Sequence, residues 1–237
     1  MTTTEINRGN MAAAIEERFL ASLQARPAKQ FADLAQLRDL AGNHTGHIRV
    51  YEADRLVKAS FLCVDVGPGR YFNAHIIPDP AYDIPRFVYE GMVTPMGSQI
   101  SMDLFPDVDA SAEVLHLLDL LADAEQVYNE ARKDPDYQFV PSRQMHMRAF
   151  SSPLFLLACN VEEGQLAGLE HYAHGYFDAW LSLYEKGATV SEEAAAARAA
   201  RRQHMARTLI DLDPDRHLVV QVYGEPLTQA IEAASML

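Results

Sequence analysis

The sequence lacks the short motifs by which many nucleotide-binding, cofactor-binding and hydrolytic enzymes are recognised. Its 237 residues contain no GxGxxG, no P-loop, no GxSxG, no HExxH and no CxxC pattern. Each of these patterns places particular atoms around a phosphate, a nucleophile, a metal ion or a pair of thiols. Their absence argues against a flavin or nicotinamide site built on a βαβ unit.

Cysteines and long apolar runs are also scarce. The two cysteines, Cys63 and Cys159, both lie within apolar segments, which is typical of reduced core thiols in a cytosolic protein. No apolar run approaches the roughly 20 residues that a bilayer span needs, and no basic stretch followed by an apolar one opens the chain. We therefore expect a cytoplasmic protein that does not enter a membrane.

Basic residues are outnumbered, with 20 lysines and arginines against 33 acidic residues and a net charge of −13. This charge argues against a nucleic-acid surface, because phosphates would be repelled. A local basic patch remains compatible with it. The densest candidate is formed by Arg198, Arg201, Arg202 and Arg207, on a predicted helix. These arginines are either a docking surface for an acidic partner or an ordinary solvated helix face.

Hydrophobic periodicity predicts a helix, then about five or six strands joined by tight turns, then further helices. No linker or repeat divides the chain, which predicts a single domain over residues 1–237 with a flexible tail at 1–10. Consecutive strands joined by tight turns must be antiparallel. The predicted strands are 47–53, 55–66, 71–77, 87–94 and 98–105, and the predicted helices are 11–26, 112–132 (capped by Ser111 or Asp109), 161–186 (closed by Gly187), 191–210 (capped by Ser191) and 216–237.

Two of these strands carry polar residues in unusual positions. Glu90 shares one face of its strand with Val88 and Met92. A carboxyl group between apolar neighbours is either exposed at an edge strand or buried, and burial would raise its pKa and make it a proton donor. Asn73 and His75 likewise share one face, and are either a hydrogen-bonding pair or solvent-facing.

The segment FNAHIIPDPAYDIPRFVYEGMVT (72–94) resembles the central segment of one family, the ferredoxin-dependent bilin reductases, with the phycocyanobilin-forming branch nearest. LDPDRHLVVQVYGEPLTQAI (212–231) resembles its closing segment, and FSSPLFLLACN (150–160) weakly resembles the segment between them. The resemblance runs from about residue 47 to the end and is dense only in these patches.

The resemblance implies a fold and an activity. The fold would be a three-layer α/β/α sandwich with a central, mainly antiparallel sheet, and the tetrapyrrole would lie between the sheet and the C-terminal helices. No flavin, metal or nicotinamide would be bound, and reduced ferredoxin would deliver electrons one at a time. The activity would be the proton-coupled, radical reduction of biliverdin, or a related linear tetrapyrrole, to a phytobilin such as phycocyanobilin.

The resemblance also implies roles for individual residues. Glu90 falls where the family has a catalytic aspartate, and Asn73 falls where it has a catalytic histidine. His75, two residues further on, faces the same side and could substitute. Asp213 matches a late aspartate of the substrate pocket, although taken alone it is an ordinary Asp-Pro turn. Met92, beside Glu90 on its face, is expected to contact the bilin.

Two features of the family have no clear match. Its second catalytic glutamate is missing, and Asp65 would replace it only if the strand register shifted. No arginine lies near Ala158, where the family pairs one with a propionate. A non-catalytic bilin- or heme-binding protein therefore remains an alternative to the enzyme, as does a reductase of a chlorophyll catabolite on the same fold.

Overall fold

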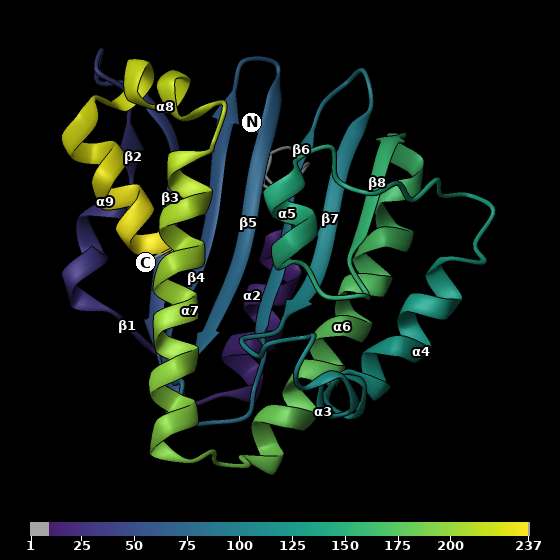
Figure 1. Cartoon of the computed structure of the whole chain (residues 1–237). Helices are drawn as coiled ribbons and strands as arrows, with labels where there is room; N and C mark the ends of the chain where they lie inside the picture. The colour runs from purple at the N-terminus through teal and green to yellow at the C-terminus, as the bar shows by residue number, and fades with distance from the viewer. Residues whose placement is uncertain (1–9, 237) are drawn as a thin grey trace.

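The computed structural model describes residues 10–236, and its centre is an eight-stranded β-sheet (Figure 1). The expected flexible tail at 1–10 lies outside these residues except for its last position. The strands are β1 (Arg26–Pro27), β2 (Leu37–Arg38), β3 (His44–Glu52), β4 (Leu56–Val66), β5 (Gly69–Pro78), β6 (Arg86–Val93), β7 (Ser98–Phe105) and β8 (Leu156–Val161).

Neighbouring strands of the sheet run antiparallel. The order is β1-β3-β4-β5-β6-β7-β8, with β2 beside β3. Strands β3 to β7 follow one another in sequence and in space, as the tight turns predicted. β8 was not predicted as a strand, and it joins the edge beside β7 after three helices. In this register Asn73 lies opposite Glu90, and Glu90 lies opposite Ser101.

The helices precede and follow the meander of strands. None of those within residues 10–236 combines the length and apolar character that a bilayer span needs. They are α2 (Ala12–Ser22), α3 (Val114–Leu120), α4 (Ala122–Ala131), α5 (Met145–Phe150), α6 (Leu166–Lys186), α7 (Glu192–Asp211), α8 (Arg216–Tyr223) and α9 (Glu225–Ser235), with short 3-10 helices η1 (Lys29–Ala35) and η2 (Glu163–Gln165).

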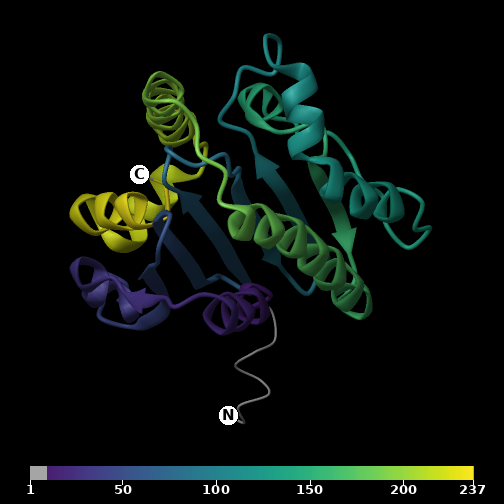
Figure 2. The ribbon, with the colours of Figure 1, turned by 90° about the horizontal axis from the view of Figure 1, so that it is seen from below.

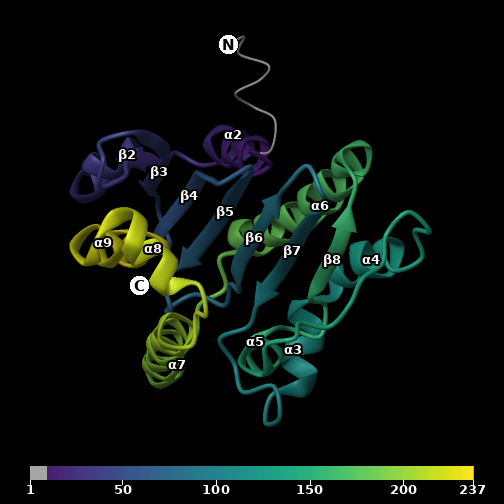
Figure 3. The same ribbon diagram turned by 90° about the horizontal axis from the view of Figure 1, so that it is seen from above.

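Helices cover both faces of the sheet (Figures 2 and 3). α2 and α6 pack on one face, where the largest apolar cluster joins Phe19, Phe72, Tyr89 and Trp180. α5, α7, α8 and α9 lie on the opposite face, which we call the C-terminal face. Smaller clusters there bring Tyr223 and Ile231 onto β3 and β4, and Met205 onto β6 and β7. The predicted α/β/α sandwich is therefore confirmed.

The helix predicted over 112–132 is broken. α3 ends at Leu120 and α4 begins at Ala122, with Leu121 outside helical geometry between them. Neither proposed residue caps α3. Asp109 instead accepts hydrogen bonds from the backbone N–H groups of Ser111 and Ala112, in the turn before the helix.

The two long helices after β8 were predicted with their end signals. Gly187 ends α6 in the left-handed conformation, with φ of 58°. At the start of α7, Ser191 Oγ accepts a hydrogen bond of 3.2 Å from the backbone N–H of Ala194. These ends position α7 over the sheet, which carries the candidate site on the same face.

Candidate functional site

The candidate residues predicted on strands gather on the C-terminal face. Asn73 and His75 alternate along β5, and Glu90 and Met92 alternate along β6. Val88, two residues before Glu90, packs with Phe105 and Met205, which places this side of β6 beneath α7. Asn73 and His75 are buried, whereas Glu90 and Met92 are half-buried.

Glu90 is held by three hydrogen-bond donors. The Tyr71 hydroxyl and Asn73 Nδ2 each donate to Glu90 Oε2 over 3.1 Å. Ser101 Oγ, on β7, donates to Glu90 Oε1 over 3.5 Å. Because the donors come from β5 and β7, the two strands that flank β6, the register of the sheet fixes the position of the carboxyl group.

Removal from water raises the pKa of Glu90, and this effect outweighs the hydrogen bonds from Tyr71, Asn73 and Ser101, which lower it. The negative charge of Asp213 raises the pKa further. A carboxyl group in such surroundings keeps its proton at a higher pH than an exposed glutamate does. The geometry therefore makes Glu90 a candidate general acid.

Asp213 lies in the loop between α7 and α8, near this end of the sheet. Its charge also raises the pKa of the Tyr71 phenol. Asp213 thus raises the pKa values of both partners in the hydrogen bond between Tyr71 and Glu90. Its Oδ1 accepts from the backbone N–H of Asp215 over 2.9 Å, which closes the Asp-Pro turn. The turn therefore holds a half-buried carboxylate whose charge reaches Glu90 and Tyr71.

His75 is fixed in a neutral form. Its Nδ1 donates to the backbone carbonyl of Ser235 over 2.7 Å, so its Nε2 carries the lone pair, and that atom has no hydrogen-bond partner. Burial, followed by the charge of Arg86, lowers the pKa of His75 to about 3. At neutral pH His75 offers an acceptor rather than a proton. The Oδ1 atom of Asn73 is a second buried acceptor without a hydrogen-bond partner.

The predicted arginine patch is wrong for two of its four members. Arg198 is 5% exposed and pairs with Asp83, while Arg202 is 8% exposed and pairs with Asp107. They lie on the buried face of α7 with Met205, and their partners come from distant parts of the chain. Arg201 is half-buried and donates to the Asp107 carbonyl, whereas Arg207 is exposed.

Asp65 does not replace the missing second glutamate. It pairs with Arg70, and the burial of its neighbours on β4 places it on the face of the sheet opposite the C-terminal face.

Substitution of Arg202 by methionine should lower the free energy of unfolding by about 1–3 kcal/mol. Asp107 would lose one of its two guanidinium partners but would keep Arg86, 3.3 Å away, so the loss should be smaller than for an isolated buried pair. Arg207→Met, on the exposed side of the same helix, is the matched control and should change stability by less than about 0.5 kcal/mol. Urea denaturation of the two variants measures the difference, and equal stabilities would contradict the pairing.

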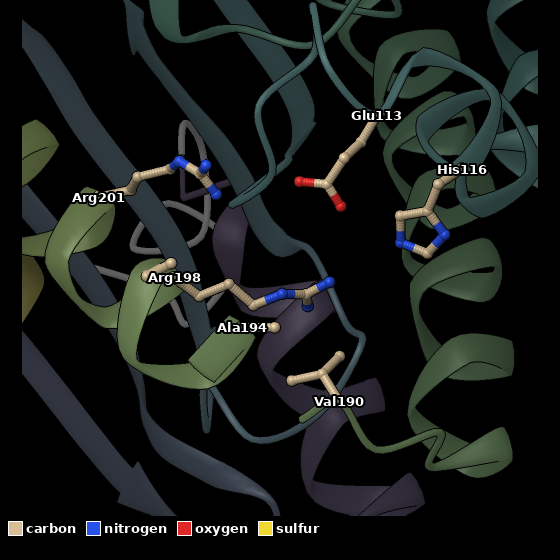
Figure 4. Close-up of a pocket in the computed structure, with 7 residues that line it drawn as sticks. Glu113, His116, Val190, Ala194, Arg198 and Arg201 are labelled. Carbon is tan, nitrogen blue, oxygen red and sulfur yellow. The ribbon is translucent and has the colours of Figure 1, made fainter. Parts of the chain in front are cut away.

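Two cavities lie away from Glu90. One of about 280 Å³ lies between α3 and α7, and in Figure 4 the side chain of Glu113 points into it, opposite Arg198 and Arg201. A hollow of about 1160 Å³ lies at the β4–β5 and β6–β7 turns and extends to Glu170 on α6. Neither is lined by Asn73, His75, Glu90 or Asp213. Among the described residues, no group of three or more histidine, cysteine or acidic side chains is placed to hold a metal ion.

Sequence reasoning missed two partners of Glu90. Tyr71 precedes Asn73 by two residues, so strand alternation places it on the same face. Ser101 lies opposite Glu90 in the β6–β7 hairpin, whereas counting outward from the predicted turn at 95–97 gives Met102 as the partner. The loop of the structure, 94–97, is one residue longer than the predicted turn, so only the signal for Tyr71 is present in the sequence.

Comparisons with known proteins support the fold. No family model matches the chain, and no curated protein matches it. A crystal structure of phytochromobilin synthase from tomato in complex with biliverdin is similar, with a TM-score of 0.79. The similarity covers 91% of this chain and 77% of the tomato chain at 17% sequence identity.

Proposed function

We propose that this protein is a bilin reductase, which reduces biliverdin or a related linear tetrapyrrole with electrons from reduced ferredoxin and without a bound cofactor. The observation that carries the proposal is Glu90, a half-buried carboxyl group with a raised pKa on the C-terminal face, held by three donors. Each electron that reaches a bilin must be matched by a proton, and Glu90 supplies it. A phytobilin such as phycocyanobilin is the proposed product.

The neighbours of Glu90 suit a tetrapyrrole in other respects. Asn73 Oδ1, an acceptor without a hydrogen-bond partner, would accept from a pyrrole N–H group. Met92 would contact the ring system, and Asp213 would act from the loop side. The likeness of the fold to an enzyme crystallised with biliverdin adds support.

Electron delivery requires docking of ferredoxin, an acidic protein, to an acidic chain. Such docking needs a local positive surface. Arg198 and Arg202 form buried ion pairs with Asp83 and Asp107. Of the predicted patch, Arg201 and Arg207 are therefore the two residues proposed to contact ferredoxin.

A second candidate function is non-catalytic binding of a bilin or heme. It is favoured by His75, which is held neutral, and by Asn73 at the position where the resemblance implies a histidine. Anaerobic incubation with biliverdin, ferredoxin and a reducing system separates the two functions, because only the enzyme consumes the bilin.

Both functions predict that purified protein binds biliverdin with one-to-one stoichiometry, with a red-shifted or sharpened bilin absorbance. An absorbance titration at micromolar protein measures it. Asn73→Leu, which removes an acceptor and a donor to Glu90 while keeping the side-chain size, should weaken the complex. A bilin spectrum that the wild-type protein leaves unchanged would contradict both functions.

A further inference from the structure

Positive charge is in excess inside the protein beneath α7 and α9, on the face that carries the candidate site. Lys58 is 5% exposed, and Arg86 and Arg202 are also buried. The Asp107 carboxylate serves both guanidinium groups, with Arg86 Nε 3.3 Å from its Oδ1 and Arg202 Nε on its Oδ2. One carboxylate thus compensates two arginines, and Lys58 adds a third cation.

The other buried carboxylate of this region, Asp103, acts on Arg86 through its charge but forms no ion pair with any cation among the described residues. It accepts hydrogen bonds from the backbone N–H and the hydroxyl of Ser152 and from the backbone N–H of Leu104. Among the described residues, Lys58 forms no ion pair, and its Nζ donates to the backbone carbonyl of Ala233. Buried charges are ordinarily paired, because an uncompensated one is costly.

The last turn of α9 supplies a partial substitute for an anion. The Ala233 carbonyl accepts from Lys58, and the Ser235 carbonyl accepts from His75 Nδ1. The C-terminal end of a helix carries about half a negative charge, which compensates the cations only in part. Burial accordingly lowers the pKa of Lys58 to about 8.

His75 Nε2 and Arg202 Nη2 are buried polar atoms without a hydrogen-bond partner. Arg86 Nε and Asp107 Oδ1 also lack one, but they face each other as an ion pair at 3.3 Å. Lys58 and Arg202 converge near the first two of these atoms, because Lys58 lies opposite Ile77 in the sheet and Arg202 Nη1 donates to the carbonyl of the next residue, Pro78. An ammonium and a guanidinium group with a spare donor are the groups that bind a carboxylate.

We propose that Lys58 and Arg202, beside His75, form a subsite for a carboxylate of the ligand, which replaces the last turn of α9 as the partner of Lys58. The proposal rests on the proposed function, because a linear tetrapyrrole such as biliverdin brings two propionate side chains. One propionate would then be bound inside the protein, further along β5 from Glu90, with its charge neutralised by Lys58.

The test compares the affinities of biliverdin and of its dimethyl ester, whose propionates carry no charge. Wild-type protein should bind the ester at least about 10-fold more weakly, the effect of one charge-assisted contact. Lys58→Met should bind both compounds alike. Arg207→Met, which removes an exposed cation, is the matched control and should keep the wild-type preference. Lys58→Gln, which keeps a donor for the Ala233 carbonyl, replaces Lys58→Met if the latter does not fold.

Each outcome decides the proposal separately from the proposed function. Equal affinities in the wild-type protein, or an unchanged preference in the Lys58 variant, would overturn the subsite and leave bilin binding intact. If neither compound binds, the proposed function fails, and acetate alone tests the carboxylate site. A rise in Tm with acetate in the wild-type protein, absent in the Lys58 variant, would support that site, and no rise would overturn it.

Discussion

Replacement of Glu90 by glutamine should lower the rate of bilin reduction about 10²–10⁴-fold, the usual contribution of a positioned general acid. Glutamine keeps the shape of the side chain and an oxygen that Tyr71 and Asn73 can donate to, as they do to Glu90 Oε2. It loses the ionisable proton, and its NH2 group takes the place of the oxygen that accepts from Ser101 Oγ. Bilin binding should therefore persist, and electron transfer without proton transfer should accumulate a bilin radical, visible by electron spin resonance.

The rate is measured anaerobically with biliverdin, ferredoxin and a reducing system, and the product is identified by chromatography. Glu170→Gln is the matched control. Burial also raises the pKa of Glu170, but this residue lies on α6, on the opposite side of the sheet from the C-terminal face, so its substitution should leave the rate unchanged. Glu90→Asp should keep partial activity, since it retains the proton on a shorter side chain. A wild-type rate in Glu90→Gln would contradict this role for Glu90 and would make Asp213 the next candidate proton donor.

The central strands of the fold could be predicted because alternation and turn residues agree there. The turns at 67–69 and 95–97 each close a hairpin. Successive side chains along its strands point to opposite faces of the sheet, and most positions on both faces are buried. β1 and β2 are two residues long and carry no periodicity. β8 lies in a continuous apolar run, which does not distinguish a strand from a buried helix.

The break between α3 and α4 has no signal in the sequence. Leu117, Leu120 and Leu121 are all buried, and neither proline nor glycine marks the change of direction. Apolar residues at these positions suit a continuous helix equally well. The packing of the two helices against the rest of the protein therefore decides the break.

The alternation of side chains along each strand was enough to predict which candidate residues share a face of the sheet. Asn73 shares its face with His75, and Glu90 shares its face with Met92. This alternation did not predict the arginines of α7. Arg198, Arg202 and Met205 recur at helical spacing on its buried side. Arginines in a helix nevertheless predict a solvent-exposed face unless their acidic partners are known. Asp83 and Asp107 lie about a hundred residues earlier in the chain, and only the tertiary structure brings them to α7.

Acid should destabilise the wild-type protein more than a His75→Asn variant. Unfolded protein takes up a proton on this histidine below its ordinary pKa of 6.5, whereas folded protein keeps His75 neutral down to a pKa of about 3. The stabilisation is therefore complete above pH 6.5 and is lost as the pH falls toward 3. In the folded state the positive charges of Arg86, Lys58 and Arg202 face His75 and oppose its protonation.

The difference between the two proteins should reach about 3 kcal/mol between pH 6.5 and 4.5, and about 5 kcal/mol if both remain folded to pH 3. Asparagine is chosen because its Nδ2 can still donate to the Ser235 carbonyl, as His75 Nδ1 does. Urea denaturation followed by the fluorescence of the single tryptophan, Trp180, which is buried, measures the free energy of unfolding at each pH. His217→Asn is the matched control, because His217 Nδ1 also donates to a backbone carbonyl but the side chain is exposed. If the free energy of unfolding depends on pH in the same way for wild type and His75→Asn, folded protein protonates His75 as readily as unfolded protein does. That result would contradict the neutral, buried His75 of the structure.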